Sequence, residues 1–139
     1  MNLLIVTGLS GAGKSLAMHA LEDIGFFCID NIPANLLAKL MEFAQQSENT
    51  LERVAVVLDI RGGKSSEDIL NALGQLKAGR VNYKILFLDA RNDVLERRYK
   101  ETRRRHPISI ASQVSTDEAI LQEREILAPL YEMADYKID

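Results

Sequence analysis

Eight consecutive residues near the amino terminus have the types and the spacing that bind phosphate. They are Gly8, Leu9, Ser10, Gly11, Ala12, Gly13, Lys14 and Ser15. This G-x-x-x-x-G-K-[ST] pattern is the P-loop, in which glycines let backbone N–H groups curl around phosphate oxygens. The lysine reaches the β- and γ-phosphates, and the serine hydroxyl is a ligand for Mg²⁺. The pattern therefore predicts a site for a nucleoside triphosphate with Mg²⁺ as its cofactor.

Such a site also needs an acidic side chain at a strand end to hold the water shell of the metal. Two aspartates follow apolar runs, Asp59 after residues 56–58 and Asp89 after residues 85–88. We favour Asp59, because its run predicts the more central strand, while Asp89 and a plain strand-end turn remain the alternatives. Asp30 follows a third run and is a candidate to orient a phosphoryl acceptor, as acids in this position do in small-molecule kinases.

The densest positive charge lies between residues 100 and 107 and includes Arg103, Arg104 and Arg105. In many P-loop kinases a segment in this chain position carries arginines onto the phosphates, where the planar guanidinium makes bidentate bonds. The alternative is a solvated helix terminus, where cations are favoured by the helix dipole. Neighbouring residues of a helix point about 100° apart, so at most one or two of these arginines are expected to face one phosphate.

Apolar runs and helical patterns alternate along the whole chain, which is typical of an α/β domain with a mainly parallel sheet. We expect strands at residues 3–6, 26–30, 53–59, 84–89 and 136–139, with helices between them. Together with the P-loop, this order predicts a three-layer P-loop NTPase fold with helices on both faces of the sheet, similar to that of small kinases. Residues 54–58 form the most continuous apolar run, which predicts a central strand.

Three local features give sharper expectations. Asn92 is placed to cap the helix after the fourth strand, and Pro129 should kink or split the last helix. The final strand begins at Tyr136 and the sequence stops inside it. Domains rarely end within a strand, so we expect residues 1–139 to be a nucleotide-binding domain at the amino-terminal end of a longer chain.

The composition excludes several other classes of protein. The 139 residues are 47% hydrophobic and 27% charged, and the net charge of −3 gives no general attraction to nucleic acid or to an anionic membrane. The apolar stretches are too short for a membrane helix, and no basic segment of a signal peptide precedes the first strand. Cys28 has no partner for a disulfide, and His19 and His106 do not make a histidine metal site. We therefore expect a cytoplasmic protein.

Several stretches beyond the P-loop together resemble one family, the RapZ family of bacterial nucleotide-binding proteins. The most specific are Leu21-Glu22-Asp23-Ile24-Gly25-Phe26-Phe27-Cys28-Ile29-Asp30-Asn31-Ile32-Pro33 and Thr102-Arg103-Arg104-Arg105-His106-Pro107. The resemblance implies ATP and GTP binding with weak hydrolysis. It assigns the P-loop to ATP and the stretch Asp59, Ile60, Arg61 and Gly62 to GTP. It also implies that RNA or protein partners are bound largely through a carboxyl-terminal domain beyond these residues.

These observations predict a slow ATPase or GTPase. Lys14 would neutralise the β- and γ-phosphates, Ser15 and Asp59 would hold Mg²⁺, and one of the three consecutive arginines would stabilise the charge of the transition state. The guanine-selective motif Asn-Lys-x-Asp is missing, so the sequence does not indicate which base is bound. Two other functions stay open: a small-molecule kinase with an arginine-bearing lid, and a non-catalytic module whose nucleotide sets its shape for a partner.

Overall fold

The computed structural model describes residues 2–9, 12–30, 32, 36–46, 53–58, 67–79, 81–95, 97 and 116–138. Its helices and strands alternate along the chain, as expected. In order they are β1 (Asn2–Gly8), α1 (Lys14–Asp23), β2 (Phe27–Ile29), α2 (Leu37–Gln46), β3 (Arg53–Val57), α3 (Glu67–Ala78), β4 (Tyr83–Leu88), α6 (Thr116–Met133) and β5 (Tyr136–Ile138). A helical turn at residues 92–95 follows β4.

The five strands form one sheet in the order β2-β3-β1-β4-β5, and every pair in it is parallel. The strand that leads into the P-loop is therefore central, with Ile5 paired to Val56 of β3 on one side and to Ile85 of β4 on the other. Strand β3 is an interior strand, as expected, with four of its five residues buried, but it is no more central than β4, because both flank β1. Because all strands run the same way, their carboxyl ends meet at one edge of the sheet.

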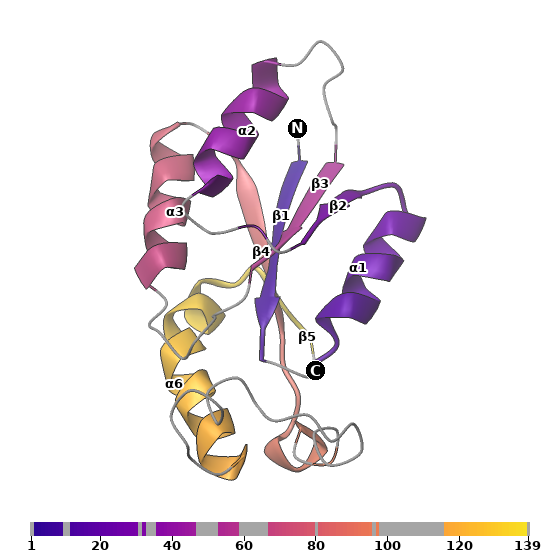
Figure 1. The fold of residues 1–139 in the computed structure, drawn as a ribbon, viewed down its shortest axis with the longest axis vertical. Helices are drawn as coiled ribbons and strands as arrows, with labels where there is room; N and C mark the ends of the chain where they lie inside the picture. Colours follow the sequence, from indigo (N-terminus) through magenta and orange to yellow (C-terminus); the bar gives the residue numbers. More distant parts are fainter. Residues whose placement is uncertain are drawn as a thin grey trace.

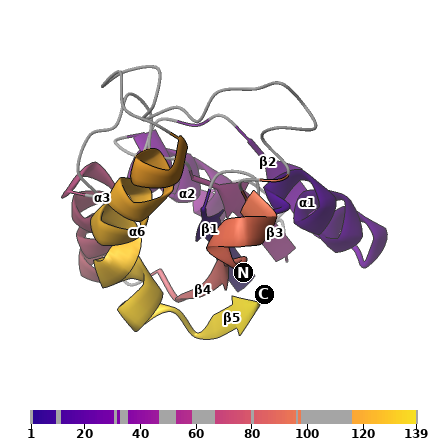
Figure 2. The same cartoon turned by 90° about the horizontal axis from the view of Figure 1, so that it is seen from below.

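The helices cover the two faces of the sheet unequally. The connection from β1 to β2 runs in one direction along the sheet and the later connections run in the other. Since parallel crossovers are right-handed, α1 lies on one face while α2, α3 and α6 lie on the opposite face (Figures 1 and 2). This arrangement confirms the predicted three-layer fold. No helix in the described ranges is long and apolar enough to cross a membrane.

The packing follows the same division. The larger core joins β1, β3 and β4 to α2, α3 and α6, and α3 alone buries Ile69, Ala72, Leu73 and Leu76. The smaller core lies under α1 and has four buried members, Val6, Val57, Leu86 and Leu88. Helix α1 itself contributes no fully buried side chain. Among the described elements, α1 alone thus covers one face of the sheet, while α2, α3 and α6 cover the other.

Two local expectations were not met: the last helix is not split at Pro129, and Asn92 is not a helix cap. Helix α6 runs unbroken from Thr116 to Met133 with Pro129 inside it, although a proline removes one backbone hydrogen bond. Leu127 and Leu130 on either side of Pro129 are both buried, so packing holds this part of the helix on the sheet. Asn92 does not cap the turn after β4, because the Arg91 carbonyl accepts the first backbone bond, from Leu95 N.

Candidate phosphate-binding site

The P-loop follows β1 at the carboxyl edge of the sheet. Two of its positions require glycine, each for a different geometric reason. Gly8 has a φ of 147°, and a Cβ there would lie 2.2 Å from the carbonyl oxygen of Leu88 on β4. Gly13 has a φ of 100°, the left-handed region, with open space around it. The first glycine lets the loop start against β4, and the second lets the chain turn into α1.

The amino end of α1 has no side-chain cap from its N-cap residue and keeps its positive polarity. Gly13 is the N-cap residue and offers no side-chain cap, and the first turn of α1 contains no acidic residue. The N–H groups of this turn therefore have no side-chain carboxylate or hydroxyl cap competing for them at the N-cap. Uncapped N–H groups at a helix amino terminus attract anions, phosphate above all.

Lys14 and Ser15 stand in this first turn. The Lys14 ammonium donates a hydrogen bond to the Gly8 carbonyl, with an Nζ–O distance of 3.0 Å, so the lysine side chain lies across the mouth of the loop. Ser15 is exposed. The structure thus places Gly8, Gly13 and Lys14, three of the residues that the sequence assigned to phosphate binding, at one end of α1.

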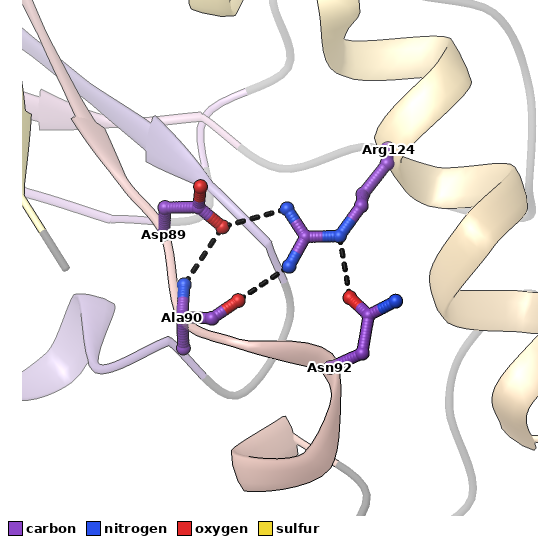
Figure 3. A network of polar contacts seen from close by, with 4 residues as sticks. All are labelled: Asp89, Ala90, Asn92 and Arg124. Atoms are coloured by element: carbon purple, nitrogen blue, oxygen red, sulfur yellow. Dashed lines mark hydrogen bonds and ion pairs between the residues drawn. The ribbon is translucent and has the colours of Figure 1, made fainter.

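Asp89, one of the two candidate metal-side acids, has a different partner. Its Oδ1 accepts a hydrogen bond from the Arg124 guanidinium of α6 at 2.8 Å and another from the N–H of Ala90 at 2.7 Å. Arg124 also donates from Nε to Asn92 Oδ1 at 2.6 Å and from Nη2 to the Ala90 carbonyl (Figure 3). The charge of Asp89 is therefore matched by a fixed guanidinium, which favours a structural role for this carboxylate.

Asp59, the other candidate, lies outside the described residues, but the chain directly before it is placed. The N–H of Leu58 donates to the Val6 carbonyl of β1 at 2.9 Å, and Leu58 is buried. Leu58, the last described residue before Asp59, thus lies beside the strand that carries the P-loop. Asp30 follows β2 at the same edge of the sheet and is exposed.

A buried hydroxyl lies at the base of the loop. Thr7 is 1% exposed, and within the described part of the chain its Oγ1 has no hydrogen-bond partner. An unpaired buried hydroxyl costs about 1–3 kcal/mol, so this group needs a water or another polar atom. It stands next to Gly8, where the P-loop begins.

The remaining predicted site residues lie outside the described residues. They are Ser10, Gly11, Ile60, Arg61, Gly62, Arg103, Arg104 and Arg105. Leu9 and Ala12 are described and belong to the loop, where the Ala12 N–H donates to the Leu9 carbonyl at 3.0 Å. No cluster of three or more potential metal-ligating side chains occurs among the residues that are described.

Cys28 is a half-buried thiol with a raised pKa. It is a free cysteine on β2, and its Sγ donates to the Met18 carbonyl at 3.5 Å. Burial, with a smaller contribution from the negative charge of Glu22, raises the pKa of the thiol above its usual value.

Sequence reasoning missed Arg124. Arg124 belongs to no local motif. It stands between Glu123 and Glu125 in a helix with many charged residues, and this pattern does not indicate a partner elsewhere in the chain. Its three acceptors lie 32 to 35 residues earlier in the chain. Only the packing of α6 beside the end of β4 makes the contact.

The whole chain, residues 1–139, matches the family model of the RapZ-like N-terminal domain. The chain belongs to this family. A relative in Caldicellulosiruptor saccharolyticus, named nucleotide-binding protein, is 52% identical over 139 residues, which are 100% of this chain and 47% of the relative. A relative of the same name in Clostridium beijerinckii is 50% identical, again over 100% of this chain and 47% of its own length. This RapZ-like chain thus spans about half the length of the curated relatives that it matches.

Solved structures show the same fold at low sequence identity. The shikimate kinase from Acinetobacter baumannii in complex with shikimate has a TM-score of 0.59 and 17% identity, over 99% of this chain and 82% of that one. The shikimate kinase from Bacteroides thetaiotaomicron has a TM-score of 0.55 and 18% identity, over 97% of this chain and 83% of that one. The RapZ-like domain therefore has the kinase-like P-loop fold.

Proposed function

We propose that this domain binds the triphosphate of ATP or GTP together with Mg²⁺ and hydrolyses it slowly. The observation that carries the proposal is the amino end of α1, where Gly13 is an N-cap without a side-chain cap and the Lys14 ammonium reaches back to the Gly8 carbonyl. The names of the curated relatives support it, since they describe nucleotide binding.

Each side chain has a distinct role in this proposal. Lys14 exchanges its bond to the Gly8 carbonyl for the β- and γ-phosphates, which are stronger acceptors because they are charged. Ser15 and Asp59 supply the hard oxygen ligands that Mg²⁺ prefers. Bound Mg²⁺ would neutralise charge on the phosphate oxygens. Asp59 is preferred to Asp89 because Arg124 already holds the Asp89 carboxylate.

The arginines that follow the fourth strand belong to the same proposal. One of Arg103, Arg104 and Arg105 stabilises the charge that grows on the phosphoryl group during hydrolysis. The stretch Asp59, Ile60, Arg61 and Gly62 contributes to nucleotide contact. We also propose that residues 1–139 act as the nucleotide-binding part of a protein about twice as long, whose other half contacts an RNA or a protein partner.

The test is calorimetric titration of the Lys14→Ala variant with ATP and with GTP. We expect the affinity for both to fall at least about tenfold, which corresponds to about 1.4 kcal/mol. Lys77→Ala is the matched control, because Lys77 stands in the last turn of α3, away from the phosphate-binding edge, and its loss should leave both affinities unchanged. Unchanged affinity in Lys14→Ala would remove the P-loop as the binding site.

A second candidate, phosphoryl transfer to a small molecule, is favoured by the exposed Asp30 at the carboxyl end of β2. The two activities make different demands on turnover. A slow hydrolase forms nucleoside diphosphate at the same rate with or without an added alcohol acceptor. A kinase forms nucleoside diphosphate much faster when the right acceptor is present, because the phosphoryl group is transferred to it. Nucleotide binding with background turnover in both cases would favour the third function, a nucleotide-sensing module.

A further inference from the structure

Two buried side chains have no part in the roles assigned so far. Among the described residues, the buried side chains that are polar or charged are those of Thr7 and Glu123, each 1% exposed. The other buried side chains in these ranges are apolar. Apolar residues are the rule at such positions, and natural proteins break the rule mainly at functional sites. We therefore examined where these two side chains lie.

Thr7 faces the side of the sheet that carries α6. Successive residues of a strand point to opposite faces, so Thr7 shares its face with Ile5, which belongs to the larger core. The register partner of Thr7 is Phe87, which lies in the same core and meets Tyr131 of α6 edge-on, with ring centroids 5.2 Å apart. Leu9 of the P-loop is buried in this core as well. The beginning of the P-loop thus has one side toward α6.

Glu123 belongs to the stripe of α6 that faces the sheet. It stands three residues after Ile120 and four before Leu127, and both of these are buried in the larger core. Taking a carboxylate out of water is costly, and an apolar residue of similar volume at such a position is often neutral or stabilising. Stability therefore gives no reason for a glutamate within this stripe.

The height of Glu123 on the sheet follows from its neighbour. Arg124 donates to Asp89, the residue directly after β4 (Figure 3). Strand β4 ends with Leu88, which is the register partner of Gly8, the first residue of the P-loop. Figure 1 shows the first turns of α6 beyond the carboxyl ends of the strands. Glu123 thus stands level with the phosphate-binding loop, on the face opposite α1.

The proposed hydrolysis still needs a group that acts on the attacking water. Lys14 and the arginines act on the charge of the phosphates, and Ser15 and Asp59 act on the metal. A carboxylate has only acceptor oxygens, so it can bind a water O–H and take its proton. A buried carboxylate is also held in a narrow range of positions by the side chains packed around it, as catalysis requires.

We propose that Glu123 is the catalytic carboxylate that orients the attacking water and takes its proton, an assignment that rests on the proposed function. The water oxygen bonds to the γ-phosphorus while the bond from phosphorus to the β,γ-bridging oxygen breaks, and that oxygen leaves with the nucleoside diphosphate. The proton moves from the water to the Glu123 carboxylate and then to the released phosphate, which restores the carboxylate. The buried Thr7 hydroxyl offers a polar contact for water at the base of the loop on the same face.

Steady-state hydrolysis and calorimetric titration of Glu123→Gln test the assignment. Glutamine keeps the shape and one acceptor oxygen but cannot take a proton. The kcat at saturating ATP should therefore fall about 100-fold, while the affinity for ATP stays within about threefold of the parent. Glu125→Gln is the matched control, because Glu125 is exposed on the same helix and its substitution should leave kcat unchanged.

A second variant separates catalysis from folding. Glu123→Asp keeps the charge but draws the carboxylate back by about 1.5 Å, so it should fold and lose about tenfold in kcat. Urea denaturation of each variant gives its folded fraction, and kcat is expressed per folded molecule. This variant decides the question if Glu123→Gln does not fold.

Two results would overturn the assignment alone. One is a parent chain that hydrolyses ATP and a Glu123→Gln variant whose kcat per folded molecule stays within about threefold of it. The other is an unfolded Glu123→Gln with a Glu123→Asp variant of full kcat, which would make the charge structural. A parent chain that binds ATP but forms no nucleoside diphosphate would instead refute the proposed hydrolysis, and this role of Glu123 with it.

Discussion

Arg124 makes the most specific structural contact in the described part of the site, and its removal gives a quantitative test. The guanidinium donates to Asp89, to Asn92 and to the Ala90 carbonyl, and so ties α6 to the end of β4. The side chains of Arg124 and Asp89 are 31% and 21% exposed, which places the ion pair between a surface pair and a buried one.

The expected loss of stability follows from these three bonds. A neutral hydrogen bond contributes about 1 kcal/mol net and a charged one somewhat more, while partial exposure reduces the ionic share. Arg124→Ala should therefore lower the free energy of unfolding by about 3 kcal/mol. Arg124→Lys keeps one point-charge contact but not the fork, and should lose about half as much. At about 3 °C per kcal/mol for a domain of this size, the melting temperature of Arg124→Ala falls by about 9 °C.

Urea denaturation followed by circular dichroism measures the effect. Arg91→Ala is the matched control, because Arg91 pairs with Asp93 at 3.3 Å with both side chains well exposed, and its loss should cost less than about 0.5 kcal/mol. A double-mutant cycle with Asp89→Asn should give a coupling energy of about 1–2 kcal/mol. If Arg124→Ala costs no more than Arg91→Ala, the inference that Arg124 holds Asp89 in a structural role is wrong.

Three further predictions concern the chemistry. Asp59→Asn should abolish the Mg²⁺ dependence of hydrolysis while metal-free nucleotide binding persists, whereas Asp89→Asn should mainly lower stability. Steady-state rates at varied Mg²⁺ concentrations measure the difference, and the reverse pattern would make Asp89 the metal-side acid. Among Arg103, Arg104 and Arg105, one alanine substitution should lower turnover more than affinity, with poor rescue by lysine; if every variant stays within about twofold, no lid arginine exists. Iodoacetamide should alkylate Cys28 more slowly than free cysteine at pH 7.5, because a raised pKa leaves less thiolate at neutral pH, and the rate should increase as the pH rises. Equal alkylation rates for Cys28 and free cysteine would contradict the raised pKa.

The elements of the fold were largely predictable, because each depends on the local pattern of apolar residues. The strand expected at residues 53–59 is β3 at Arg53–Val57, and the strand expected at residues 84–89 is β4 at Tyr83–Leu88. The P-loop was predictable for the same reason, since Gly8 and Gly13 are needed by backbone geometry within one short loop. Pro129 shows the limit of local rules, because buried leucines on both sides keep α6 continuous.

The sequence by itself determined the P-loop, the parallel α/β class and the candidate acids, all of which follow from residues close together in the chain. Only the tertiary structure decided that β1 lies between β3 and β4, so that both candidate acids follow strands paired with the P-loop strand. It also separated them, because α6 brings Arg124 to Asp89 from 35 residues away. Such a pairing depends on how a helix packs on a sheet, and packing brings together residues that no local spacing connects.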